Sequence, residues 1–200
     1  LYENNTPELA RLPKGSDADV LTLASGLPSW VAPAGGGGKM ELVDSDVLTG
    51  AGSSLACSFT AINQVDIAYL KIVLNAKMDD ASAEAQPNLL RINSISDNTY
   101  NQDGISCVAG SESILNNVNQ SYIAITQDSH DGNRFATAEI ICNISGNIEV
   151  NMAGGGQDGY YTAFGYNSTA SQTSIDNITV LTGAGNMSTG SSLHVYKVVN

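Results

Sequence analysis

Residues 127–133 bring together the side-chain types of a hydrolytic triad, with two aspartates, Ser129 and His130 in one short segment. Members of such a triad must converge from a scaffold that holds them rigidly. Neighbouring residues in one turn point apart instead. We therefore expect no catalysis from this segment, and the chain is not predicted to be an enzyme.

The same segment and residues 44–46, Asp-Ser-Asp, also offer oxygen ligands that partly match a calcium loop. A calcium loop places carboxylates or amides at alternating positions and closes with a glutamate. In residues 127–133, His130 takes one of these positions and no glutamate closes the site. Solvated turns are the favoured interpretation, so the sequence predicts no metal site. The glycine run at residues 154–156 is not followed by a helix or a P-loop lysine, and no cofactor is expected.

Aromatic side chains crowd a glycine-flanked segment that contains Phe164 and three tyrosines. Aromatic faces beside Asn and Asp are typical of sugar sites. The favoured alternative is that alternate members of this run fill the core. The candidates for contact with a glycan or another surface are Tyr100, Tyr160, Tyr161 and Tyr166.

The charge of the chain narrows the classes of partner. Twenty acidic residues against eight basic ones give a net charge of −12. Nucleic-acid binding depends largely on Lys and Arg contacts to phosphates, so we do not expect this acidic chain to bind nucleic acid. No apolar run approaches the ~20 residues that span a bilayer, and the N-terminus lacks the layout of a signal peptide. We expect no membrane insertion, and Leu1 suggests that the sequence is part of a longer polypeptide.

The three cysteines, Cys57, Cys107 and Cys142, are far apart and odd in number. A disulfide framework or a metal knuckle would show paired spacing. Cys57 and Cys142 lie in alternating apolar segments, which predicts buried free thiols.

Alternating apolar residues indicate the elements of the fold. In residues 69–78, Leu70, Ile72, Leu74, Ala76 and Met78 share one face, as expected for a strand with one buried side. Similar segments predict about nine strands in all, at residues 40–43, 55–62, 69–78, 88–92, 122–126, 138–144, 160–166, 175–181 and 193–199. Turns are expected at 97–104, 128–133 and 154–159, and a short helix near 111–118. The pattern predicts an all-β fold, a jelly-roll-like antiparallel β-sandwich.

A run of glycines divides the chain into parts. We expect a β segment at residues 1–33, a flexible linker at 34–38 and a sandwich head at 39–200. The first segment has too few apolar residues to form a core alone, while ordering its backbone costs about 1–2 kcal/mol per residue. Copies of the same segment are the expected partners, which predicts a trimer interface formed by Leu9, Leu12, Val20, Leu21, Leu23, Leu27 and Trp30.

Residues 14–30, KGSDADVLTLASGLPSW, closely resemble the element "KGTDGQVLTLASGVPSWA" of bacteriophage tail-fibre and related virion proteins. One departure is Ala18-Asp19, where the family usually has Gly-Gln. Weaker similarities to the accompanying β-sandwich head lie at residues 58–62, 69–74, 165–168 and 188–197. The resemblance implies a phage structural protein, usually trimeric, with a short intertwined β stalk, which projects from the virion to contact a host surface.

These observations lead to three functional hypotheses. The first is a homotrimeric fibre or spike on the phage particle, attached to other virion proteins and binding a host glycan or protein. The alternative is a capsid or tail decoration protein that stabilises the particle without binding a receptor. The third, a polysaccharide-degrading tailspike, would need paired carboxylates. It is disfavoured because the chain lacks a long repetitive β-helix, although four glutamates could be paired, namely Glu84, Glu112, Glu139 and Glu149.

Overall fold

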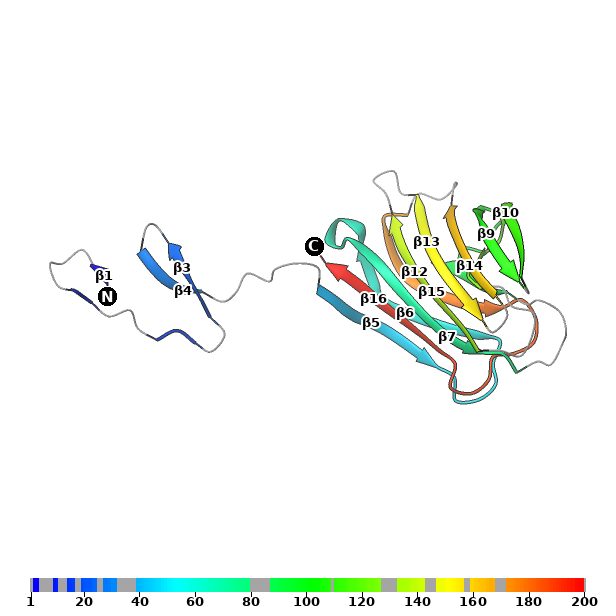
Figure 1. The fold of residues 1–200 in the computed structure, drawn as a ribbon, viewed down its shortest axis with the longest axis horizontal. Helices are drawn as coiled ribbons and strands as arrows, with labels where there is room; N and C mark the ends of the chain where they lie inside the picture. Colours follow the sequence, from blue (N-terminus) through cyan, green and yellow to red (C-terminus); the bar gives the residue numbers. More distant parts are fainter. Residues whose placement is uncertain are drawn as a thin grey trace. The chain divides into compact units, whose positions relative to one another are not determined.

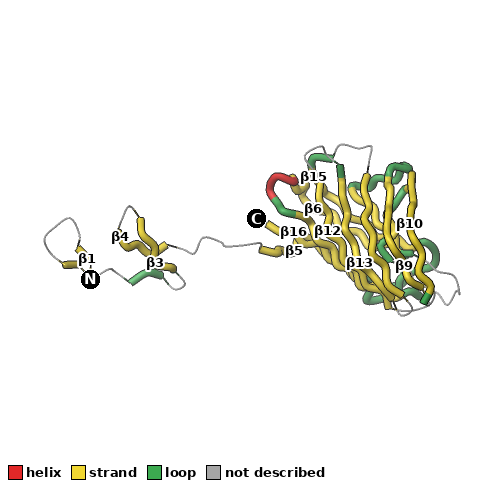
Figure 2. The backbone as a smooth tube through the Cα atoms, turned by 45° about the horizontal axis from the view of Figure 1, so that its top comes forward, coloured by secondary structure: helices red, strands yellow, loops and turns green. Residues whose placement is uncertain are grey.

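The computed structural model divides into two compact units, Leu1–Gly37 and Gly38–Asn200, which are treated separately below (Figures 1 and 2). It describes residues 2–3, 9–10, 14–16, 19–24, 27–31, 39–79, 87–108, 110–126, 133–142, 147–156, 159–167 and 172–199. The segment around His130 lies outside these residues. The described residues hold no helix long and apolar enough to cross a membrane.

The second unit, here called the head, consists of two antiparallel sheets stacked on one shared core (Figure 1). The prediction of an all-β antiparallel sandwich is confirmed, while jelly-roll connectivity stays a prediction. The larger sheet has the order β10-β9-β14-β13-β12-β7-β16-β5 and the smaller one β11-β8-β15-β6. The strands are β5 (Lys39–Val47), β6 (Ser54–Asn63), β7 (Tyr69–Lys77), β8 (Asn88–Ile92), β9 (Tyr100–Val108), β10 (Ser111–Gln120), β11 (Ile123–Ala124), β12 (Asn133–Cys142), β13 (Ile148–Gly156), β14 (Gly159–Asn167), β15 (Ser174–Thr182) and β16 (Ser192–Val199), with a short 3-10 helix η1 (Gln64–Asp66).

The core lies between the sheets and follows the expected alternation. In and just after β7, Leu70, Ile72, Leu74, Ala76 and Met78 are all buried, as the sequence predicts. Strands β6, β8 and β15 of the smaller sheet supply the facing apolar side chains. Each fully buried Leu, Ile or Val contributes about 1.5–3 kcal/mol.

Several sequence predictions within the head are wrong. The short helix expected near residues 111–118 is the edge strand β10, which pairs with β9 through a turn at Gly110 with φ of 80°. The turn expected at residues 97–104 largely belongs to β9. There, Tyr100 and Gln102 are buried while Asp103 is exposed, so the polar residues face solvent from a regular strand. The glycines at 154–156 likewise end strand β13.

The free edges of the two sheets meet along one side of the sandwich, where β5 approaches β6. Asp46 Oδ2 accepts a hydrogen bond from the Ala56 N–H at 2.8 Å, and Asp44 Oδ2 accepts one from the Ser58 N–H at 3.0 Å. These carboxylates cap backbone donors that a sheet edge otherwise leaves open. The interpretation of residues 44–46 as a solvated turn is therefore wrong, because they belong to β5.

The first unit contains two small antiparallel ribbons. Strand β1 (Tyr2–Glu3) pairs with β2 (Leu9–Ala10), and β3 (Val20–Ala24) pairs with β4 (Leu27–Val31). The described residues of this unit thus form four short strands. Whether copies of this unit intertwine stays a prediction.

Candidate functional site

The β3–β4 ribbon carries five of the seven residues predicted for the trimer interface. Leu21 lies opposite Trp30 and Leu23 lies opposite Pro28, so these four side chains share one face of the ribbon. Leu23 is 76% exposed and Trp30 is 39% exposed in the single chain. One face of this ribbon is therefore entirely apolar and largely uncovered by its own chain.

The opposite face of the ribbon is mixed. Val20 and Leu27 are exposed there, next to Thr22, whose hydroxyl donates to the Ser29 carbonyl oxygen at 3.3 Å. Of the two other predicted interface residues, Leu9 lies in β2 with its side chain outside the described residues, and Leu12 is itself outside them.

A tight turn before β3 covers part of the Trp30 ring. A Cβ atom added to Gly15 would lie 2.6 Å from Trp30 Cγ, so the ring packs directly on the glycine backbone. The Ser16 N–H donates to Asp19 Oδ2 at 2.7 Å, and the Asp19 N–H donates to the Ser16 carbonyl oxygen at 3.1 Å. Asp19, part of the Ala18-Asp19 departure from the phage element, thus forms hydrogen bonds within the turn that contacts Trp30.

The tyrosines predicted as surface contacts separate into different environments. Tyr100 is fully buried, and its hydroxyl accepts from the Ile92 N–H at 3.1 Å and donates to the Ile92 carbonyl oxygen at 3.2 Å. Its inclusion among the surface contacts is wrong, because its position in β9 points to the core. Tyr161 and Tyr166 lie in β14, but their side chains are outside the described residues.

Tyr160 is 47% exposed on the outer face of the larger sheet. Its hydroxyl donates to Glu112 Oε1 at 3.0 Å, which joins β14 to β10 across β9. The hydrogen bond to Glu112 and the charge of that carboxylate raise the pKa of Tyr160. The hydrogen bond thus ties Tyr160 to an acidic residue of the edge strand β10.

Further exposed apolar residues surround Tyr160 on the outer face. Phe164 follows it on β14, and Ile105 on β9 pairs with Ile114 on β10, which is 88% exposed. Phe135 on β12 is also exposed. It lies two strands from Tyr160, because Gly155 on the intervening strand β13 pairs with both residues. Neither Ile105 nor Ile114 was singled out from the sequence, since a turn was expected just before Ile105 and a short helix around Ile114.

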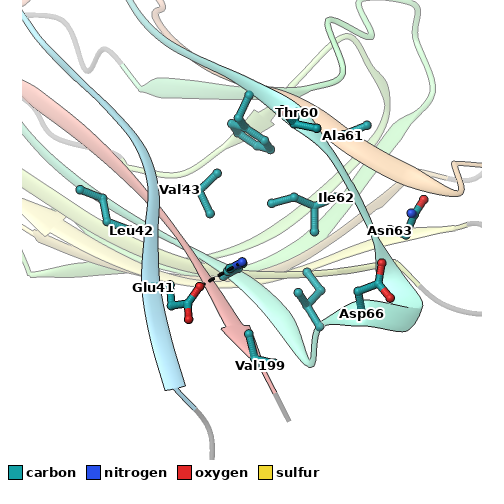
Figure 3. A pocket seen from close by; sticks show the side chains of 12 residues that line it. Glu41, Leu42, Val43, Thr60, Ala61, Ile62, Asn63, Asp66 and Val199 are labelled. Carbon is teal, nitrogen blue, oxygen red and sulfur yellow. Dashed lines mark ion pairs between the residues drawn. The ribbon is translucent and has the colours of Figure 1, made fainter.

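A cavity of about 530 Å³ opens between β5–β16 and β6–η1, where the two edge strands diverge (Figure 3). One extra residue in β5, Val43, lies between the pairs Val195–Asp44 and Tyr196–Leu42. In Figure 3, Val43 and Ile62 point into the space from opposite walls. The bulge thus turns β5 away from β6 just beyond the Asp44 cap.

An ion cluster lies at the mouth of this cavity. Glu41 pairs with Lys39 at 2.8 Å and with Lys197 at 3.0 Å. Hydrogen bonds from Lys39 and Lys197, together with their charges, lower the pKa of Glu41 to about 2. The cluster joins the ends of β5 and β16. Lys39 and Glu41 are neighbours on one face of β5, but the sequence offered no signal for Lys197, which is far from them along the chain.

Cys57 is a buried thiol behind the two capping aspartates. Burial, with added repulsion from Asp44 and Asp46, raises the pKa of Cys57 to about 12. Its prediction as a buried free thiol is confirmed. The side chain of Cys142 lies outside the described residues. Among the described residues, no group of three or more His, Cys, Asp or Glu side chains could hold a metal ion.

No protein-family model and no curated protein matches the chain. Among solved structures, a Shewanella oneidensis MR-1 protein of unknown function, SO2946, is similar with a TM-score of 0.32 and 14% identity, over 80% of this chain and 78% of its own. A structure described as HCR/D-Sa-GBL1/C is similar with a TM-score of 0.29 and 10% identity over 92% of this chain. The match covers 48% of that second structure's length. Similarities this weak support no inference about this chain.

Proposed function

We propose that this chain is a subunit of a homotrimeric bacteriophage fibre or spike. Its N-terminal segment would join three copies, and its head would contact the host surface. Two observations support this. Residues 14–30 resemble an element of phage fibre proteins, and the β3–β4 ribbon formed within that stretch exposes an apolar face. The exposed face is the observation that carries the proposal.

The energetics of the ribbon favour a partner. An isolated two-stranded hairpin is marginally stable in water. Burying each of its leucines would contribute about 1.5–3 kcal/mol, and burying a tryptophan would contribute more. Every copy of the chain carries the same ribbon and therefore offers a matching apolar face. Apolar residues on its second face, including Val20 and Leu27, suit contacts with two neighbours at once.

Three linked heads explain how a weak contact could hold a particle to a cell. Once one head is bound, the next contact is intramolecular, and avidity can exceed the affinity of a single site by about 10²–10⁴. The partners on this proposal are two sister subunits, other virion proteins and a glycan or protein of the host. Particles that lack this chain should then lose host adsorption while still assembling.

The assembly proposal is tested by placing charge on the apolar face. The variant Leu21→Asp/Leu23→Asp should abolish the trimer, because two carboxylates would have to be buried in the interface. The matched control is Val65→Asp in η1 of the head, where the side chain is 91% exposed. Sedimentation equilibrium should show a trimer for the wild type and the control. A monomeric wild type, or an intact trimer in the double variant, would contradict the proposal.

A further inference from the structure

We propose that the outer face of the larger sheet is a contact surface between heads, with one half of the face packing against the opposite half on a second copy of this chain. The inference rests on the proposed trimer and names the surfaces that its heads would use. The acidic half is the outward side of β10, β9 and β14. The basic half is the outward side of β7, β16 and β5.

The strand register fixes which side chains point outward. On β7, the buried Leu70, Ile72 and Leu74 face the core, so Lys71 and Lys77 face out. Across the sheet, Lys71 pairs with Tyr196, and Tyr196 pairs with Leu42. These residues therefore lie on the same outer face as Tyr160 and Phe164 at the other end of the sheet.

Both halves expose large apolar side chains. The acidic half presents Ile105, Ile114, Tyr160 and Phe164, and the basic half presents Met40, Leu42 and Val47 from edge strand β5. A monomer seldom exposes two such groups on one face, and contiguous apolar patches commonly mark interaction sites. Each half can thus supply the apolar centre of an interface.

The charges of the two halves are complementary. Strands β9, β10 and β14 contain no Lys or Arg, and the exposed side chains of the acidic half include Asp103 and Glu112. The basic half carries Lys71 and Lys77. Lys71 lies opposite Glu139 of the neighbouring strand β12, whereas Lys77 lies opposite Asn133, so Lys77 contributes most to the positive charge of this half. The acidic residues of β5 are occupied elsewhere. Asp44 and Asp46 cap β6, and Glu41 binds two lysines at the cavity. Contact between unlike halves places lysines against carboxylates, whereas contact between like halves opposes equal charges.

When the acidic half of each copy packs against the basic half of the next, the contact is a head-to-tail interface. Such an interface forms a closed ring when the rotation between neighbouring copies permits it. A face-to-face dimer about a two-fold axis would satisfy the same charges, so the number of subunits is part of the test. In the ring, Tyr160 contacts a sister head rather than a glycan.

The size of the face sets the strength of this contact. Eight strands about 4.8 Å apart, each about nine residues long at about 3.3 Å per residue, give a face of roughly 1,000 Å². Each half is three strands wide and therefore offers roughly 400 Å², about half of the ~800 Å² per partner of a standard interface. The contact should be weak between free heads and should form when the N-terminal segments raise the local concentration.

Charge exchange in the full chain tests this surface. Reversing the acidic half with Asp103→Lys/Glu112→Lys should raise the trimer dissociation constant about tenfold or more, because lysines then face lysines. Reversing the basic half with Lys77→Glu should also raise the constant, and Lys71 is left unchanged because Glu139 lies opposite it within the same head. Combining the three changes should bring the constant back towards the wild-type value, since lysines and carboxylates then face each other again with opposite sign. Sedimentation equilibrium at fixed ionic strength supplies the constants and the subunit number.

The matched control is Asp66→Lys/Asp176→Lys, two exposed acids away from the outer face. Asp103→Lys/Glu112→Lys and this control change the net charge by the same amount. If only Asp103→Lys/Glu112→Lys weakens the trimer, the effect therefore cannot come from the net charge. A wild-type trimer that is unaffected by either reversal, a combined variant as weak as the two reversals together predict, or a dimer would each overturn the inference. The first two results would leave the proposed trimer intact. A monomeric wild type would overturn both proposals.

Discussion

Single side chains determine where the sandwich is closed and where it is open. Asp44 and Asp46 alternate on β5 and reach the backbone donors of Ala56 and Ser58 on β6. Val43, the extra residue of β5, ends this alternation and leaves the cavity beyond it. The sequence shows two aspartates with one residue between them, a spacing that fits a turn equally well. Only the neighbouring strand, ten or more residues away along the chain, reveals their role.

Glu41 should make the stability of the head depend on pH. Its pKa is lowered to about 2 in the folded chain, so ionised Glu41 favours folding above its ordinary pKa of 4.5. We predict that wild type is more stable than Glu41→Gln above about pH 5.5, and that the difference shrinks as pH falls towards about 2. Urea unfolding from pH 2 to pH 7 measures it. A difference that is constant with pH would contradict the account, and added salt should reduce it.

Alternation in the sequence identified some strands of the larger sheet and missed others. Strand β7 holds four alternating apolar residues and lies where expected, whereas β13 was not among the expected strands although Ile148, Val150 and Met152 alternate in it. Strands β9 and β10 were missed because Asn, Asp, Ser and Gly occupy many of their positions, which is typical of turns. Their pairing with β14 and with each other supplies the regular structure. The outer face was therefore only partly predictable, from the aromatic run of β14.

The turn that supports Trp30 makes a prediction about the β3–β4 ribbon. The variant Gly15→Ala should weaken the trimer, because the new Cβ would lie 2.6 Å from the indole ring and must displace it. Gly50→Ala in the head is the matched control, since nothing lies within 4 Å of its added Cβ. We expect the trimer dissociation constant to rise for Gly15→Ala and to stay unchanged for Gly50→Ala. Equal behaviour of the two variants in sedimentation would refute the role given to this turn.

At the scale of the whole molecule, the chain combines a head with its own core and an N-terminal unit with exposed apolar strands. The predicted boundary, a linker at residues 34–38, falls where the two compact units divide, between Gly37 and Gly38. This division was predictable because four consecutive glycines interrupt the pattern. The intertwining of subunits was not, since a single sequence does not reveal which apolar residues contact another copy.

The central claim is that the N-terminal unit holds three chains together, and its removal tests this most directly. Sedimentation equilibrium would compare the full chain with one that starts at residue 34. We predict a full-length species of three times the 20.8 kDa chain mass and a folded, mostly monomeric head after the deletion. A stable trimer without residues 1–33, or a monomeric full chain, would contradict the account.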